Sequence, residues 1–334
     1  MSINYILNFY IAKFLPLISL LLFIYQISIN WFYFFNFETS RNITFNLVIK
    51  YIYIFFYLLS LFSFIMTYIT DPGYVNQDNN EVFLFMYQKT RKYSLNRAEL
   101  YNENHKKKNN DIDDDYDLFT DGLSSDDEQK FQESNYLKEF YINCKKFKRV
   151  LNFDVKQCRQ CYIIKVSGIA HCSICHKCVY MKDHHCIWFN KCIGQFNLKY
   201  YILFLFYLLL CSYISFMRFV YYILCKNLIQ IIFKYSFIKR MGLIAFNLLD
   251  IMYIVFCFKL LYDQYTNLND FSIIYDYKRK KIIEIRTRYE MLCEIFGNKF
   301  NIGWFLPFKA GGYYGMYKNE QNIKVNLEHK VKKY

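Results

Sequence analysis

The chain has 334 residues, of which 54% are hydrophobic and 22% aromatic, and its formal net charge is +14. The mean hydropathy of +0.02 hides a strong segregation, because apolar stretches lie toward both ends and a charged region lies between them. This pattern does not predict a single soluble globular domain.

Four apolar stretches are long enough to cross a bilayer, whose hydrocarbon core of about 30 Å needs roughly 20 helical residues. They cover residues 14–35, 45–69, 200–225 and 241–262. The first could be the core of a signal peptide, but it has no small-residue cleavage site and runs further than such a core. We therefore expect an α-helical multi-pass membrane protein with four transmembrane helices.

Two charged residues, Arg218 and Asp250, fall inside these stretches. Charges at membrane depth usually face a partner or a cavity, so they are compatible with a transporter. The sequence has no pair of Gly/Pro-broken helices and no internal helix repeat to support that function. A mutual ion pair, or snorkelling toward the surface, is the expectation.

Residues 76–143 read as a low-complexity insert, in which a lysine-rich block is followed by blocks of aspartate. Such blocks cannot bury enough apolar surface to offset the entropy of ordering, so disorder is predicted. The bias toward Asn, Lys, Ile and Tyr is typical of an AT-rich genome, such as that of an apicomplexan parasite.

A metal-ligand pattern, Cys-x2-Cys-x9-His-x6-Cys, occurs twice at an offset of 14 residues. Each copy supplies three thiolates and one imidazole, which is a complete tetrahedral set for a structural zinc ion. The alternative is a set of buried core cysteines, but core packing does not require a paired spacing. The first copy is Cys158, Cys161, His171 and Cys178, and the second is Cys172, Cys175, His185 and Cys192.

Between Lys156 and Lys199, seven cysteines and four histidines occur, so this repeat leaves one cysteine and two histidines unused. His184 and Cys186 are two of these, and Asp183 precedes them. A spare thiol, a spare imidazole and an acid on a metal-stiffened loop form a nucleophile constellation. The alternative is that Cys186 is a redundant ligand or an inert thiol.

These residues resemble the DHHC-type protein S-acyltransferases, the palmitoyltransferases of eukaryotic membranes. The resemblance is centred on Asp183-His184-His185-Cys186 and runs on through Trp188, Cys192 and Gly194 to Asn197. Upstream, Asp71-Pro72-Gly73 is similar to the motif that follows the second membrane helix of this family. Downstream, Phe296-Gly297 and Trp304-Phe305-Leu306-Pro307 are similar to its C-terminal tail.

The sequence also departs from the family pattern. Ile187 replaces the proline that usually follows the nucleophile, and Thr266-Asn-Leu-Asn269 is a poor copy of the Thr-Thr-x-Glu signature. A Lys/Arg-Pro-x-Arg element is also lost, since Val166 follows Lys165 and Gly168 replaces the arginine. These losses concern the bracing between the tail and the zinc domain.

The resemblance implies a two-step acyl transfer in which Cys186 attacks a long-chain acyl-CoA, with palmitoyl-CoA as the expected donor. The acyl group then passes to a cysteine of a membrane-associated protein. His184 would accept the proton of Cys186, and Asp183 would orient the imidazole. Two structural Zn²⁺ ions would hold the loop, and His185 would serve as a ligand and not as a base.

Zinc-binding thiolates persist in a reducing compartment, so the cysteine-rich domain and both termini are expected in the cytosol. The lysine and arginine count supports this orientation only in part. The predicted division is residues 1–75 for the first two helices, 76–143 for the insert, 144–199 for the zinc domain, 200–262 for the last two helices and 263–334 for the tail. The endomembrane system, either Golgi or ER, is the expected location.

Two further residues are candidates for the acyl cavity. Trp188 is placed to anchor at the membrane interface, or it is an ordinary belt tryptophan. Cys211 lies near the depth that the end of a palmitoyl chain would reach, and a small side chain there would leave room for longer chains. The alternative is that Cys211 faces lipid.

The composition also leaves two alternatives to an enzyme, an RNA-binding protein and a membrane adaptor. Lysine-rich zinc knuckles can bind RNA. No nucleic-acid partner is expected, because the domain is tethered between membrane helices, where its lysines would face anionic lipid or the phosphates of coenzyme A. The remaining alternative is a catalytically inactive, zinc-stabilised membrane adaptor.

Overall fold

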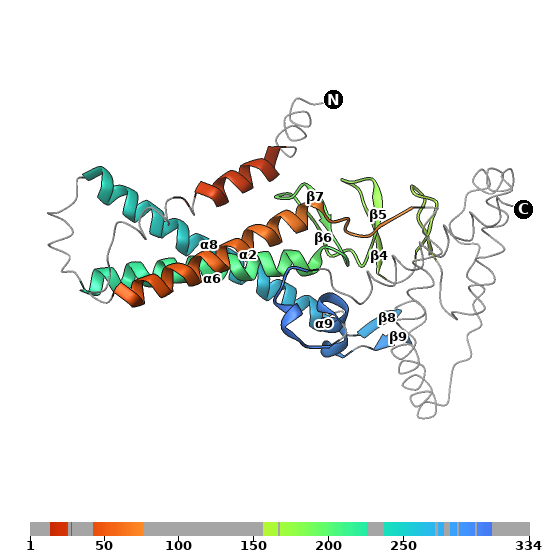
Figure 1. Cartoon of the computed structure of the whole chain (residues 1–334). Coiled ribbons are helices and arrows are strands. Elements are labelled where there is room, and N and C mark those ends of the chain that lie inside the picture. Colours follow the sequence, from red (N-terminus) through yellow and green to blue (C-terminus); the bar gives the residue numbers. More distant parts are fainter. Residues whose placement is uncertain are drawn as a thin grey trace, which may run out of the picture.

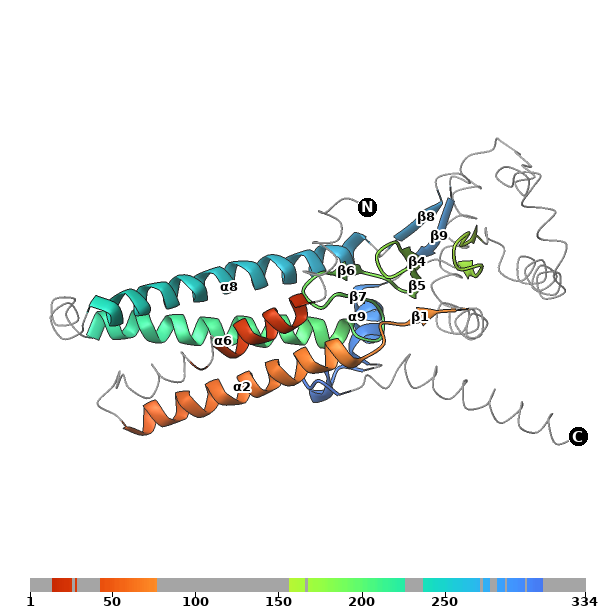
Figure 2. The same ribbon diagram turned by 90° about the horizontal axis from the view of Figure 1, so that it is seen from above.

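Three long helices run side by side and make one end of the molecule (Figures 1 and 2). They are α2 (Ile43–Ile69), α6 (Leu198–Cys225) and α8 (Phe237–Asp270), and α6 packs against both of the others. This computed structural model describes residues 14–25, 28, 43–76, 156–165, 168–225, 237–270, 273–276, 281–285, 287–297 and 299–308.

A shorter apolar helix, Phe14–Tyr25, lies against this bundle. Its Phe23 is buried and stacks on Phe64 of α2, with ring centroids 6.3 Å apart. The same ring meets Phe204 of α6 edge to face at 5.9 Å. Aromatic packing therefore joins the N-terminal helix to α2 and α6 close to the cysteine-rich end.

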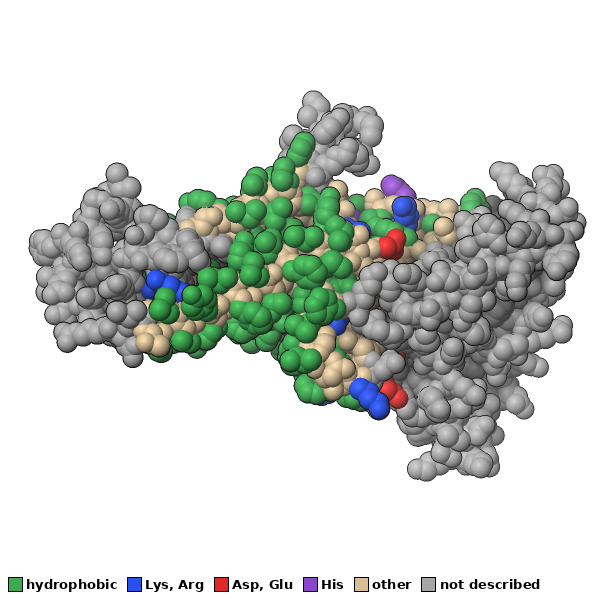
Figure 3. Space-filling model, in the orientation of Figure 1, with side chains coloured by type: hydrophobic (Ala, Val, Ile, Leu, Met, Phe, Trp, Pro, Cys, Tyr) green, Lys and Arg blue, Asp and Glu red, His purple; other side chains and the backbone are tan. Residues whose placement is uncertain are grey.

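Two of the four predicted spans, Thr44–Ile69 and Leu198–Tyr221, are long and apolar enough to cross a membrane in the part of the chain that the structure describes. Only 28% and 44% of their apolar windows are buried, which is unlike the core helix of a soluble protein. Hydrophobic side chains cover much of the face of the bundle that Figure 3 shows. The structure supports two spans, and the set of four stays a prediction.

The first and fourth predicted spans differ from the helices that form there. Among the described residues, the first contains the helix Phe14–Tyr25, while α8 extends past both ends of the fourth. Asp250, inside α8, is fully buried and accepts a hydrogen bond from Ser215 Oγ of α6 at 2.6 Å. The expected ion pair between Asp250 and Arg218 stays a prediction.

The cysteine-rich domain consists of three small antiparallel sheets at one end of the bundle (Figure 1). The sheets have the strand orders β1-β5-β4, β2-β3 and β6-β7. Pairs of strands this short are marginally stable alone, so the domain needs further cross-links. The strands are β1 (Tyr74–Val75), β2 (Lys156–Gln157), β3 (Ile164–Lys165), β4 (Ile169–Cys172), β5 (Lys177–Tyr180), β6 (His184–Cys186) and β7 (Lys191–Ile193).

The Asp71-Pro72-Gly73 motif turns the chain out of α2 and into β1. Asp71 Oδ1 accepts hydrogen bonds from the backbone N–H groups of Gly73 at 2.7 Å and Tyr74 at 2.8 Å. Gly73 has a φ of 103°, a left-handed conformation that glycine adopts without steric cost. Its carbonyl accepts from Tyr180 N at 2.8 Å, so the turn joins α2 to the sheet of the metal domain.

The C-terminal tail folds back onto the start of α6. It contains β8 (Ile273–Asp276), β9 (Lys281–Ile285), α9 (Arg288–Phe296) and the short 3-10 helix η1 (Ile302–Trp304). Thr287 and Glu290 form a capping box that starts α9, and Trp304 is buried against Phe296. Lys199 Nζ donates to Gly303 O at 2.7 Å, and Tyr207 donates to Phe305 O.

The predicted domain division stays a prediction, and two of its boundaries differ in detail from the elements of the structure. A boundary at residue 75 assigns Tyr74 and Val75 to the helices, but both residues pair with β5 of the metal domain. A tail starting at residue 263 cuts α8, which continues to Asp270. Apart from Asn76, the predicted insert lies outside the described residues.

Candidate active site and metal centres

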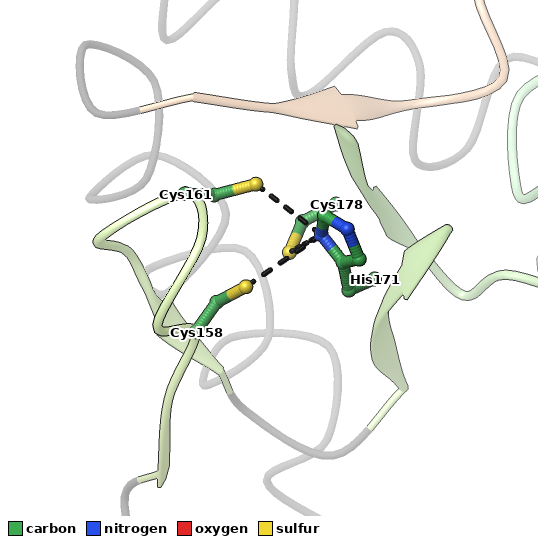
Figure 4. A group of neighbouring side chains, drawn as sticks. All are labelled: Cys158, Cys161, His171 and Cys178. Carbon is green, nitrogen blue, oxygen red and sulfur yellow. Dashed lines mark hydrogen bonds between the residues drawn. The ribbon is translucent and has the colours of Figure 1, made fainter. Parts of the chain in front are cut away.

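The first predicted ligand set comes together in space. His171 Nδ1 lies 3.6 Å from Cys158 Sγ, 3.4 Å from Cys161 Sγ and 3.8 Å from Cys178 Sγ. All four donor atoms lie within 4.8 Å of one another, and Figure 4 shows the side chains converging on one point. This arrangement could hold one metal ion.

The second set has nearly the same geometry. His185 Nδ1 lies 3.6 Å from Cys172 Sγ, 3.3 Å from Cys175 Sγ and 3.8 Å from Cys192 Sγ. The hydroxyl of Tyr74 in β1 also donates to Cys175 Sγ at 3.8 Å. Within the described part of the chain, His171 Nε2 of the first group is buried without a hydrogen-bond partner.

These distances fit a tetrahedral zinc ion. Bonds of about 2.3 Å to sulfur and about 2.0 Å to nitrogen at tetrahedral angles separate the sulfur and nitrogen atoms by about 3.5 Å. Burial and the neighbouring cysteines raise the pKa of the Cys178 and Cys192 thiols well above the ordinary value. Several thiolates this close together therefore need a bound cation, which makes the fit chemical as well as geometric.

Strand geometry explains how the two sets interleave. His171 and Cys178 are direct partners across β4 and β5, and both belong to the first set. His185 and Cys192 are direct partners across β6 and β7, and both belong to the second. Because consecutive strand residues point to opposite faces, His171 and Cys172 of β4 serve different sets.

The residue after each Cys-x2-Cys has a left-handed backbone. Tyr162 has a φ of 54° and His176 a φ of 52°, so the two copies of the motif make the same turn. The exposed His176, one of the two unused histidines, therefore lies in a turn and outside both donor groups.

The other unused residues lie on one face of β6. His184 and Cys186 are two positions apart in the strand, so their side chains point to the same face, while His185 points to the metal group. Cys186 is only 5% exposed, and its thiol interacts with the His184 imidazole. The structure therefore brings the predicted thiol and imidazole together.

Asp183 completes this constellation. His184 Nδ1–H donates to Asp183 Oδ2 at 2.8 Å. Burial by itself would lower the pKa of His184, but the interactions with Asp183 and Cys186 outweigh it and raise the pKa to about 9. The imidazole is therefore protonated at neutral pH, beside the Cys186 thiol.

Two amides of α8 hold the carboxylate. Gln264 Nε2 donates to Asp183 Oδ2 at 2.7 Å, and Asn267 Nδ2 donates to Asp183 Oδ1 at 3.2 Å. Burial by itself would raise the pKa of Asp183, but the hydrogen bonds from His184, Gln264 and Asn267 outweigh it and lower the pKa. Asp183 therefore stays charged and fixes the orientation of the imidazole.

The Cys186 thiol borders an apolar cluster between the helices, which includes Phe64, Phe189, Tyr201 and Cys257. The two acyl-cavity candidates lie at different places around the bundle. Trp188 is 40% exposed, and its ring meets Phe256 of α8 edge to face at 6.5 Å. Cys211 is 4% exposed and packs against Tyr53 of α2, so it does not face lipid.

Comparison with known families assigns this domain. Residues 152–299 match the model of the DHHC palmitoyltransferase family. The chain carries a DHHC palmitoyltransferase domain. The DHHC domain contains both metal groups, the Cys186 face of β6 and the two amides of α8.

Curated relatives share the core of the DHHC domain. "Probable protein S-acyltransferase 14" of Arabidopsis thaliana is 51% identical over 53 residues, which is 16% of this chain and 17% of that protein. "Palmitoyltransferase ZDHHC15" of Rattus norvegicus is 44% identical over 78 residues, or 23% of each chain. "Palmitoyltransferase ZDHHC2" of Homo sapiens is 41% identical over 70 residues, or 21% of this chain and 19% of that protein. The chain thus spans less than a quarter of the length of each of these relatives.

The two amides of α8 that hold Asp183 are not among the site residues that the sequence predicts. Gln264 belongs to no predicted motif, and Asn267 falls only within the poor Thr266-Asn-Leu-Asn269 match. The sequence does contain a signal for them. Gln264 and Asn267 are polar and three residues apart, so they share a face of a helix. The predicted end of the span at residue 262 obscured it.

Proposed function

We propose that this protein is a protein S-acyltransferase that forms an acyl-thioester on Cys186. The observation that supports this most directly is the placement of Cys186 and His184 on one face of β6, with Asp183 hydrogen bonded to His184 at 2.8 Å. A thiolate is the attacking form of cysteine, and a neighbouring imidazolium stabilises it. The relatives named as palmitoyltransferases and as a probable S-acyltransferase support the same chemistry.

In the first step, Cys186 Sγ attacks the thioester carbonyl carbon of an acyl-CoA, and the bond from that carbon to the CoA sulfur breaks. The proton that His184 took from the Cys186 thiol passes to the departing CoA thiolate. In the second step, His184 takes the proton of an acceptor cysteine, whose thiolate attacks the acyl group. Cys186 leaves as a thiolate and regains a proton from His184.

The donor we propose is a long-chain acyl-CoA, with palmitoyl-CoA as the representative. The Cys186 thiol borders apolar side chains, and each buried methylene contributes about 0.8 kcal/mol to binding of the chain. Cys211 would lie beside the far end of the chain, and Trp188 would lie at the interface near the nucleophile. Lysines of the DHHC domain would face the CoA phosphates and the anionic lipid surface.

The metal groups have a structural part in this proposal. Each offers four protein ligands, which is the closed set of a structural zinc site with no position left for substrate. Zinc bound there would cross-link the short strands, supplying the stability that their packing lacks. Cys186, His184 and Asp183 would do the chemistry.

We propose a multi-pass arrangement of four spans, with the DHHC domain, both termini and the tail in the cytosol. Thiolate ligands persist in that reducing compartment, and acyl-CoA is available there. The acceptors would be membrane-associated proteins with cytosolic cysteines, and the endomembrane system, Golgi or ER, is the proposed location. The bilayer is then a partner, and nucleic acid is not.

The test is labelling of the purified protein with a palmitoyl-CoA analogue, followed by hydroxylamine, which cleaves thioesters. Wild-type protein is expected to carry a hydroxylamine-sensitive label, and Cys186→Ser to carry none while keeping the wild-type metal content. Labelling that persists in Cys186→Ser would contradict the proposed nucleophile. Wild-type protein that binds zinc but takes no label would support the inactive adaptor instead.

A further inference from the structure

The last turn of α2 is completed by side chains from the metal domain. The final carbonyls of a helix have no partner within the helix, and a cation there also interacts favourably with the helix dipole. α2 has no basic residue in its own last turn. Lys191 Nζ instead donates to Tyr68 O at 2.7 Å and to Thr70 O at 2.8 Å, while Asn197 Nδ2 donates to Thr67 O at 3.5 Å.

Lys191 lies directly across the hairpin from Cys186. The register of β6 and β7 pairs Cys186 with Lys191, next to the pair of His185 and Cys192. Directly paired residues of antiparallel strands share a face, so Lys191 and Cys186 are on one face and the metal group is on the other. The lysine that binds the end of α2 is thus the cross-strand partner of the nucleophile.

The turn after α2 and the residues after β7 approach each other closely. A Cβ on Gly194, the residue after β7, would lie 2.5 Å from Pro72 O. Phe196 N also donates to the same carbonyl at 3.5 Å. The end of α2, the turn after it and the strand opposite Cys186 therefore form one contact, and Lys191 is its positively charged member.

We propose that Lys191 is a positioning residue for Cys186, which fixes the nucleophile strand against the end of membrane helix α2. This inference rests on the acyl transfer proposed for Cys186. Lys191 does not touch the reacting atoms, because its ammonium is bound by the α2 carbonyls. Its loss should let β7 shift, and a displacement of about 1 Å at a reacting group can cost about 100-fold in rate.

A neutral side chain of similar length separates this role from simple packing. Lys191→Met keeps the stem but loses the donors, while Lys191→Arg keeps a cation that can reach the carbonyls. Lys259→Met is the matched control, because Lys259 is a lysine of α8 whose ammonium contacts the exposed Asp263 at 2.5 Å. Lys191→Gln, a neutral donor, is a second variant if Lys191→Met fails to fold.

The full-length proteins would be compared in lipid nanodiscs for acyl-enzyme formation, zinc content and amide hydrogen exchange. For Lys191→Met we expect kcat to fall roughly 10- to 100-fold with KM for palmitoyl-CoA nearly unchanged. Zinc content should stay at the wild-type value, and exchange should rise at the end of α2 and in β6 and β7. Lys191→Arg should recover most of kcat, and Lys259→Met should match wild type.

Several results would overturn the inference. They are an unchanged kcat in both neutral variants, an equal loss in Lys191→Arg, or loss of zinc together with the activity. Hydrogen exchange distinguishes failure of the positioning role from failure of the proposed acyl transfer. If wild-type protein transfers no acyl group, unchanged exchange in the neutral variants still overturns the positioning role, and increased exchange at these segments still supports the contact.

Discussion

His185 and Cys186 are consecutive residues whose side chains leave opposite faces of β6, one toward a metal group and the other toward the apolar cluster between the helices. A zinc ion on one face would therefore fix the position of the thiol on the other without touching it. Damage to the metal group and damage to the nucleophile should accordingly give distinguishable variants.

Removing a ligand should affect the metal and the fold together. Cys158→Ser and Cys192→Ser are each expected to lose about one zinc per chain and to lower the thermal midpoint, since metal binding and folding are coupled. His176→Ala is the control and should keep both metals. Elemental analysis with thermal unfolding measures this, and lost activity with unchanged metal and midpoint would contradict a structural role.

The two adjacent histidines should differ in their response to pH. The pKa of His184 is raised to about 9 from its ordinary 6.5, so its imidazolium is complete at low pH and is lost as the pH rises through about 9. The stability that this charge contributes is complete below about pH 6.5 and is lost as the pH rises from 6.5 to about 9. The wild-type rate of acyl-enzyme formation should hold across neutral pH and fall near pH 9, when the imidazolium can no longer protonate the CoA thiolate.

His184→Ala should slow acyl-enzyme formation by roughly 10²- to 10⁴-fold, the usual contribution of a general acid or base. Raising the pH should restore part of this rate, because hydroxide then deprotonates the thiol. His185→Ala should show no such recovery, since its defect is loss of metal. The same pH response in both variants would remove the separate roles assigned to them.

The amides of Gln264 and Asn267 should stabilise the negative charge of Asp183. A hydrogen bond to a charged group contributes about 1.5–3 kcal/mol, so Gln264→Ala and Asn267→Ala should each lower the rate by roughly 10-fold or more. Gln264→Glu should be worse than Gln264→Ala, because it places a second carboxylate beside Asp183. Steady-state kinetics with zinc analysis would decide, and an equal or better rate for Gln264→Glu would exclude the proposed contact.

Cys211 allows a test of acyl-chain length. It lies 13 residues after the start of α6 at Leu198, so it is roughly 20 Å along the helix at 1.5 Å per residue. Cys211→Phe should shift preference toward shorter chains in competition between C14, C16 and C18 acyl-CoAs. Met217→Phe, which adds a ring on an exposed face of α6, should leave the profile unchanged. An unchanged profile in Cys211→Phe would contradict the placement of Cys211 beside the end of the acyl chain.

The site was more predictable from sequence than the fold around it. Ligand spacing is a local property, so the pattern of Cys158 to Cys192 predicted both metal groups and left Cys186 and His184 unassigned. Hydropathy, by contrast, reports where a helix meets lipid and not where it ends. It therefore missed the polar last turns of α8, which carry Gln264 and Asn267.

Contacts between distant segments were the least predictable. Nothing in the sequence near Lys191 indicates that its ammonium binds carbonyls of α2, because backbone acceptors leave no residue-type signal. The pairing of β1 with β5 was missed for a related reason. A strand of two residues, Tyr74 and Val75, is too short to show an alternating pattern.

The pairing of β1 with β5 determines where the long segment between β1 and β2 begins. The chain leaves the described structure just after Val75, which pairs with β5, and returns at Lys156, which pairs with β3. Both ends of the excursion are therefore attached to the DHHC domain. For a flexible loop, each doubling of length costs only about 0.6 kcal/mol. Because the composition of residues 76–143 predicts disorder, we expect that the excursion can be lengthened, shortened or replaced by a linker at little thermodynamic cost, and that the hairpin of β6 and β7 would keep its place.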